Sequence, residues 1–190
     1  MLNNLELIKP ITPQEVFETW RGMEESLEHW KDVWRSKGFK SWEDWRHATH
    51  APLFEKDLDW KLYKISEPLK SVPQWKGGMF HAWNKWFYNS FEEKPPLLKD
   101  LLTHPGVHNH WYVREIANNF PDSTILTALH MPNGEFVIAE GIHRACAITM
   151  LAHDNKTLNG EVFVMIADWP DEKPPRLGMG WKSDVVEIKI

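Results

Sequence analysis

The 190-residue chain has almost no cysteine and no long hydrophobic run. Cys146 is its one cysteine, which excludes an internal disulfide and is typical of proteins from a reducing compartment. No stretch reaches the apolar length needed to cross a bilayer. The N-terminus lacks the basic and apolar regions of a signal peptide. These absences predict a cytoplasmic protein that does not contact a membrane.

The chain also lacks an excess of positive charge, because its 27 acidic residues outnumber its 22 lysines and arginines. The formal net charge is −5, which removes the overall attraction that drives non-specific binding to DNA or RNA. A local basic patch is compatible with this net charge, but the composition does not favour nucleic acid as a partner. The length suits one compact domain, or a core with an added subdomain, that folds without a disulfide or a metal.

Tryptophan is abundant and unevenly distributed. The chain has twelve tryptophans, and all but Trp169 and Trp181 precede residue 112. A capping box over residues 12–15 opens a predicted helix in which Trp20, Trp30 and Trp34 recur at helical spacing with other apolar residues. This spacing favours a role in core packing. In the irregular sequence that follows, Trp75, Trp83 and Trp86, with Lys76 and His81, are better candidates for lining a pocket.

Hydrophobic spacing and turn residues predict the order of elements. We expect helices over residues 13–37, 41–50, 80–91, 97–103, 111–119 and 142–152. We expect strands over residues 60–65, 124–131, 135–139, 162–167 and 185–190. An extended segment between Pro68 and Pro73 and a loop over residues 104–110 separate some of these elements. The Asn133-Gly134 pair predicts a hairpin between two of the strands.

The segment over residues 136–148, FVIAEGIHRACAI, carries the strongest chemical signal. A buried strand ends at residue 139, Glu140 and Gly141 form a tight turn, and a helix begins with His143 and Arg144 in its first turn. Amides at a helix N-terminus favour an anion, and a guanidinium suits phosphate. Two basic residues oppose the helix dipole there unless an anion is bound. The alternative is that Arg144 pairs with Glu140 and that His143 is an ordinary satisfied side chain.

This strand–turn–helix segment, with Glu140, Gly141, Ile142, His143 and Arg144 at the turn, resembles the signature of the ParB/sulfiredoxin superfamily. The resemblance covers mainly residues 124–167. ParB proteins use such a motif on CTP, sulfiredoxins use it on ATP, and archaeal free-serine kinases use it on ADP. The resemblance implies an α+β fold with a small mixed sheet of ParB/sulfiredoxin type and a Trp-rich helical elaboration. We expect an N-terminal helical segment over residues 1–58, and a core over residues 59–190 with a helical insertion at about 75–120.

Two departures from the family's pattern limit the functions that this resemblance implies. Ile142 stands where sulfiredoxins have their catalytic cysteine, so sulfiredoxin chemistry is not expected. Cys146, one helical turn later, more often serves as a small buried hydrophobe than as a nucleophile. ParB proteins carry a helix-turn-helix DNA-binding domain after this core, and the 23 residues that follow Ala167 are too few for one. A role in chromosome partition is therefore not expected.

A histidine-rich loop precedes the predicted helix at 111–119. His104, His108 and His110 lie within seven residues. They suggest a metal site, an ordinary polar loop with a helix cap at Asn109, or a loop that faces the nucleotide and supplies a general base or a phosphate contact. No cysteine or acid lies inside the loop, so we assign no metal ligand. We take these three histidines, together with Trp83, as candidate pocket residues.

The sequence thus favours a nucleotide-binding protein whose ligand is ATP, ADP or CTP. As an enzyme it would transfer or hydrolyse a phosphoryl group with Mg²⁺, with Glu140 and His143 as catalytic residues and Gly141, His143 and Arg144 on the phosphates. The alternative is a non-catalytic nucleotide- or phosphate-binding module that acts as a switch or docks a partner. A nucleic-acid-binding protein or nuclease is the third and weakest reading. The acceptor, if there is one, is not indicated.

Overall fold

The computed structural model describes residues 4–88 and 94–179, and its centre is one five-stranded mixed sheet. The strand order is β1-β2-β5-β3-β4, in which β3 and β5 are parallel and the other neighbours are antiparallel. The strands are β1 (Leu5–Ile11), β2 (Trp60–Ile65), β3 (Ser123–His130), β4 (Phe136–Glu140) and β5 (Glu161–Asp168). The predicted α+β class with a mixed sheet is therefore confirmed.

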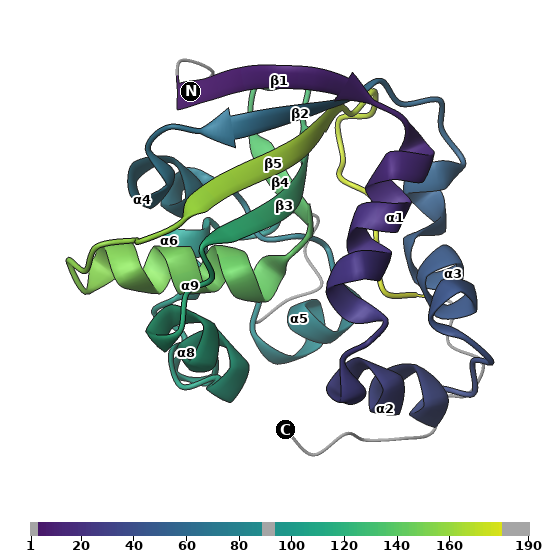
Figure 1. Ribbon diagram of the computed structural model, residues 1–190, viewed down its shortest axis with the longest axis horizontal. Helices are drawn as coiled ribbons and strands as arrows, with labels where there is room; N and C mark the ends of the chain where they lie inside the picture. Colours follow the sequence, from purple (N-terminus) through teal and green to yellow (C-terminus); the bar gives the residue numbers. More distant parts are fainter. Residues whose placement is uncertain (1–3, 89–93, 180–190) are drawn as a thin grey trace.

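Helices cover both faces of this sheet (Figure 1). On one face, Ile148 and Ala145 of α9 pack with Leu126 and Val164 of the sheet. On the other face, the N-terminal helices pack against alternate residues of the same strands, among them Leu129 and Met165. The helices are α1 (Pro13–Glu24), α2 (Glu28–Ser36), α3 (Trp42–Phe54), α4 (Pro68–Ser71), α5 (His81–Trp86), α6 (Leu98–Leu101), α7 (Pro105–His108), α8 (Trp111–Asn118) and α9 (Ile142–His153).

The predicted strand–turn–strand–helix segment is confirmed. Gly134 has a φ of +81° in the turn between β3 and β4, and its amide donates to the Met131 carbonyl at 2.8 Å. Such a φ is costly for residues with a side chain, which explains the glycine. α9 begins directly after Gly141, and β5 returns parallel to β3. The order of these elements places the first turn of α9 at the carboxyl end of β4.

The N-terminal helical prediction was only partly right. The capping box is present, because Thr12 accepts from the Glu15 amide and the Glu15 carboxylate accepts from the Thr12 amide. The single helix expected over residues 13–37 is instead two, α1 and α2, separated by residues 25–27. α3 continues past the expected end at residue 50 to Phe54, with a kink at His50 ahead of Pro52.

Proline misled the prediction in one further segment. The segment from Pro68 to Pro73, expected to be extended, forms α4 and a 3-10 turn over Val72–Gln74, because proline is favoured in a first helical turn. β1, which contains Pro10, was not predicted. The loop expected at 104–110 contains the single turn α7, and α5 ends at Trp86. The strand expected at 185–190 lies outside the described residues.

Among the described residues, no helix combines the length and the apolar character needed to span a membrane.

Candidate functional site

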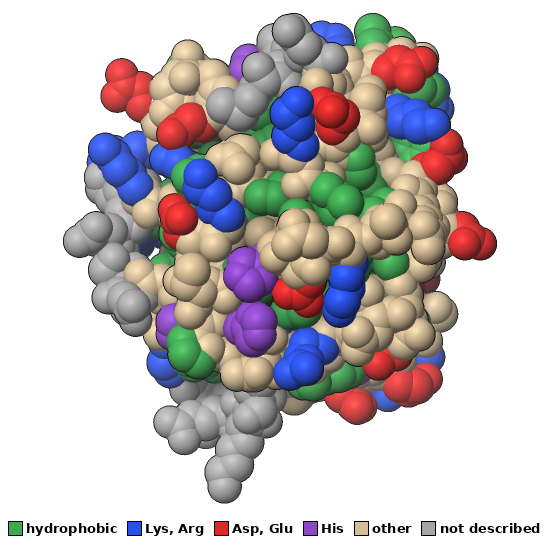
Figure 2. Space-filling view, turned by 90° about the vertical axis from the view of Figure 1, so that its left-hand side faces the viewer, with side chains coloured by type: hydrophobic (Ala, Val, Ile, Leu, Met, Phe, Trp, Pro, Cys, Tyr) green, Lys and Arg blue, Asp and Glu red, His purple; other side chains and the backbone are tan. Residues whose placement is uncertain are grey.

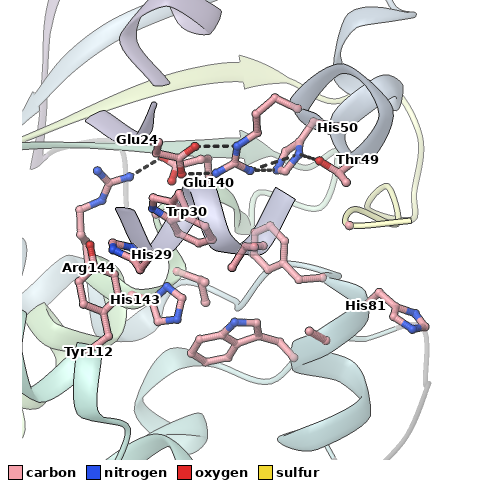
Figure 3. A pocket seen from close by; sticks show the side chains of 18 of the residues that line it. Glu24, His29, Trp30, Thr49, His50, His81, Tyr112, Glu140, His143 and Arg144 are labelled. Carbon is pink, nitrogen blue, oxygen red and sulfur yellow. Dashed lines mark hydrogen bonds and ion pairs between the residues drawn. The ribbon is translucent and has the colours of Figure 1, made fainter. Parts of the chain in front are cut away.

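A pocket of about 380 Å³ lies where the N-terminal helices meet the first turn of α9. Its walls come from the end of α1, from α2 and α3, from α5, from the start of α8, and from residues 140–144. Arg144, His143, Tyr112 and His29 lie near one end of the pocket, and His81 lies toward the other (Figure 3). The volume falls within the range of about 300–1,000 Å³ that is usual for small-molecule sites.

The turn that the sequence singled out forms one wall of this pocket. Gly141 has a φ of +87°, and the Arg144 side chain folds back across it. A Cβ at Gly141 would lie 2.9 Å from Arg144 Nη2 and 3.0 Å from Leu126 Cδ2. Glycine is therefore required twice, for the backbone angle and for the path of the arginine.

Arg144 uses its two terminal nitrogens differently. Nη2 donates to Glu140 Oε2, and Nη1 donates to the sulfur of Met23 at 2.8 Å. The pairing with Glu140, which was the alternative to an anion site at the sequence level, is therefore present. A thioether is a weak acceptor, so one side of the guanidinium is poorly satisfied.

Glu140 is a buried carboxyl group, with only 5% of its surface exposed. Burial raises its pKa, and the neighbouring Glu24 carboxylate acts in the same direction. Arg144, Arg46 and the Gly141 amide oppose this rise without cancelling it. A cavity-lining carboxyl with a raised pKa is a candidate functional group.

His143 lies among the aromatic side chains of the pocket. Its ring centroid is 5.0 Å from that of His110, and 5.2 Å from those of Trp83 and Tyr112. Burial, together with nearby His110, Arg144 and His29, lowers the pKa of His143 to about 3. The imidazole is therefore neutral at pH 7, with one nitrogen available to accept a proton or a hydrogen bond.

A second buried ion pair lies beside the first. Arg46 on α3 donates through Nε to Glu24 Oε2 at 2.7 Å and through Nη2 to Glu24 Oε1. The indole of Trp42 donates to the same carboxylate at 3.0 Å. Nη1 of Arg46 lies 3.1 Å from His50 Nε2, and burial lowers the pKa of His50 well below its usual value. This network joins α1 to α3 at the pocket wall (Figure 3).

Aromatic rings supply most of the remaining pocket surface. Trp30 and Trp45 lie with ring centroids 5.5 Å apart, and the Arg46 guanidinium is 4.4 Å from the Trp45 ring. Trp83, which is 6% exposed, contacts His143 from α5. Trp111 also lines the pocket and is 59% exposed. The pocket is thus suited to a flat, partly apolar ligand.

The structure brings together most, but not all, of the residues that the sequence selected. Glu140, Gly141, His143 and Arg144 line the pocket with His110 and Trp83. Trp86 and His81 also line it, as expected.

His104 and His108 are not among the lining residues. Nδ1 of His104 accepts from the Gly106 amide at 3.0 Å, and His108 lies beside His153 on α9. Within residues 4–88 and 94–179, no group of three or more histidine, cysteine, aspartate or glutamate side chains could hold a metal ion. In the described structure, the three histidines of this loop are therefore not gathered with one another or with a carboxylate as metal ligands.

Other candidates from the tryptophan-rich segment are in the core. Trp75 is 2% exposed and packs on Phe136, and Lys76 pairs with Glu135 at 2.8 Å. Trp30, which the sequence assigned to packing, does pack against the core with Trp45, and both residues also line the pocket.

The sequence also missed Glu24, Arg46 and His50, although a signal was present. Glu24 lies four residues after Trp20, and Arg46 and His50 follow Trp42 at the same spacing. Polar residues on an otherwise apolar helical face have to be satisfied by one another or by a ligand.

Comparison of the chain with protein-family models, with curated proteins and with solved structures found no match.

Proposed function

We propose that this protein binds a nucleotide in the pocket between the N-terminal helices and α9. The observation that carries the proposal is the meeting of a phosphate-type turn with an aromatic pocket. Arg144 and the first-turn amides of α9 offer an anion site. The rings of Trp30, Trp83 and Tyr112 lie around the adjacent His143 and offer faces for a nucleobase.

The charge around the pocket favours a ligand of modest charge. Lys37, Arg46 and Arg144 line it with Glu24 and Glu140, and both carboxylates are paired with an arginine. In the described part of the chain, the pocket therefore offers no carboxylate without an arginine partner to a metal ion. A Mg²⁺ ion that accompanies the nucleotide would be held by phosphate oxygens and water. We accordingly place a non-catalytic binding module ahead of a Mg²⁺-dependent phosphotransferase.

One observation favours turnover as a second candidate. Glu140, with its raised pKa, and His143, neutral at pH 7, line the same pocket three residues apart. Two groups whose pKa values are displaced in opposite directions are typical of acid–base pairs. In phosphoryl transfer or hydrolysis, the neutral imidazole of His143 would accept a hydrogen bond from the attacking hydroxyl or water and orient it. Release of phosphate that disappears in both His143→Ala and Glu140→Ala would support this candidate.

The face drawn in Figure 2 bears on nucleic acid as a partner. Lysine and arginine side chains on this face are interspersed with aspartate and glutamate, and no continuous basic stripe runs across it. Together with the net charge of −5, this arrangement favours a small ligand over a polyanion.

A thermal-shift screen of ATP, ADP, CTP, GTP and AMP, with and without Mg²⁺, tests the proposal. A ligand at a hundred times its dissociation constant stabilises a protein by about 2.7 kcal/mol, which raises Tm by roughly 5–10 °C for a chain of this size. We expect such a rise with at least one nucleotide, and we expect it to be lost in Trp83→Leu. The absence of a rise with any nucleotide in folded protein would refute the proposal.

A further inference from the structure

Arg144 already holds an anion in this structure, and that anion is the side chain of Glu140. Glu140 and the first turn of α9 lie on the pocket wall, and the arginine reaches the carboxylate only because Gly141 leaves room for it. A phosphate that enters the pocket and binds Arg144 therefore competes with a group of the protein itself. This consequence rests on the proposed nucleotide binding.

The two ion pairs of the pocket differ in how firmly each carboxylate is held. Glu24 receives two hydrogen bonds from Arg46 and one from the Trp42 indole. Within the part of the chain that the structure describes, Glu140 receives one side-chain hydrogen bond, from Arg144, and the amide of Gly141 helps to stabilise its charged form. Among the described residues, the other terminal nitrogen of Arg144 donates only to the Met23 sulfur, so the guanidinium would gain a stronger hydrogen bond from a phosphate oxygen. Glu140 is thus the carboxylate that a ligand can displace.

The surroundings of Glu140 do not stabilise its negative charge once it has lost Arg144. The groups that face it are Arg144 on α9, Glu24 on α1, Arg46 on α3 and Tyr112 on α8. After Arg144 binds the phosphate, Arg46 is still paired with Glu24. The Glu24 carboxylate also repels a negative charge on Glu140. An unpaired buried carboxylate is costly, and taking up a proton from solvent removes that cost.

We propose that Glu140 holds the place of the ligand's phosphate on Arg144, and that nucleotide binding exchanges the two anions and leaves Glu140 protonated. The proton comes from the solvent, so each binding event takes up close to one proton. At pH values above the second pKa of the phosphate, about 6, where the ligand is a dianion, binding consequently weakens by up to tenfold for each unit that pH rises. In this scheme Glu140 sets specificity for a dianionic phosphate, because a weaker anion does not displace it.

Calorimetric titration at pH 8 in buffers of different ionisation enthalpy, such as Tris and HEPES, measures this proton directly. AMP, ATP and CTP are suitable probes, because their phosphates are almost fully deprotonated at this pH and do not themselves take up the proton. We expect uptake of close to one proton per nucleotide by the wild-type protein. We expect none in Glu140→Gln, which also binds more tightly because the competing charge is gone.

Glu135→Gln is the matched control. Glu135 lies in the same β3–β4 hairpin as Glu140 and pairs with Lys76, but it does not line the pocket. This variant should retain the proton uptake of the wild type. Nucleotide binding without proton uptake by the wild-type protein would overturn the exchange while leaving the binding proposal intact. If none of the three nucleotides binds the folded protein, both proposals fail. The wild-type measurement alone decides the matter if Glu140→Gln does not fold.

Discussion

Acidification should destabilise the wild-type protein more than a variant that lacks the His143 imidazole. In the folded protein the pKa of His143 is lowered to about 3, and in the unfolded chain it is about 6.5. A group with a depressed folded pKa contributes stability that is complete above pH 6.5 and is lost as pH falls, because only the unfolded chain binds the proton. Between pH 6.5 and 4, the loss amounts to roughly 3 kcal/mol at 1.36 kcal/mol per unit. Partial exposure at the pocket reduces it to about 1–3 kcal/mol.

Urea denaturation of the wild type and His143→Gln at pH 7 and pH 4 isolates this contribution. Glutamine does not titrate, and the other ionisable groups contribute to both proteins. We expect the free energy of unfolding of the wild type to fall by about 1–3 kcal/mol more than that of the variant. His104→Gln, outside the pocket, should behave as the wild type does. Equal pH dependence of the wild type and His143→Gln would refute the argument that His143 is buried in its neutral form.

Three further predictions concern stability and accessibility. Gly141→Ala should lower the free energy of unfolding in urea by about 1–3 kcal/mol, because the φ of +87° and the contact with Arg144 both oppose a Cβ. Gly22→Ala should not destabilise the protein, because an added Cβ there would meet nothing within 4 Å outside its own helix backbone and chain neighbours. Arg46→Met should lower the free energy of unfolding by about 3–5 kcal/mol, because it leaves Glu24 buried without its partner. The double variant Arg46→Met with Glu24→Gln should recover part of that loss in the same assay. An equal loss in the double variant would show that lost packing dominates. Cys146 is fully buried and burial raises its pKa, so a disulfide reagent should modify it only after denaturation in guanidinium, and rapid labelling of folded protein would contradict its place in the core.

The elements that the sequence predicted well are those whose signals lie in neighbouring residues. The capping box at residues 12–15, the Asn133-Gly134 turn and the glycine before α9 each act through local backbone geometry. The break between α1 and α2 has no such signal, because helical apolar spacing continues across it and no proline or glycine marks residues 25–27. β1 is an edge strand with mostly exposed side chains, so it lacks the alternation that identifies a half-buried strand.

The residues of the candidate site also divide into those that a local sequence pattern identifies and those that it does not. Its turn, Glu140 to Arg144, is a local feature, and the sequence predicted both the anion site and the ion pair as alternatives. The helical spacing of Glu24 and Arg46 indicates only that they lie on apolar faces, and it is the packing of α1 and α3 on the sheet that brings them to the pocket. Trp75 and Trp83 are eight residues apart in irregular sequence, yet one fills the core and the other lines the pocket. Only the three-dimensional path of the chain separates those two roles.

The most direct test of nucleotide binding compares two arginines of the same chain. Arg144 lines the pocket, whereas Arg114 is exposed on α8, contacts Asn109 and does not line it. Calorimetric titration of the best nucleotide from the thermal-shift screen should give a dissociation constant at least about tenfold weaker for Arg144→Gln, the loss of roughly one charge-assisted hydrogen bond. Arg114→Gln should bind as the wild type does. Equal affinity of the wild type and Arg144→Gln would contradict a phosphate site at the first turn of α9.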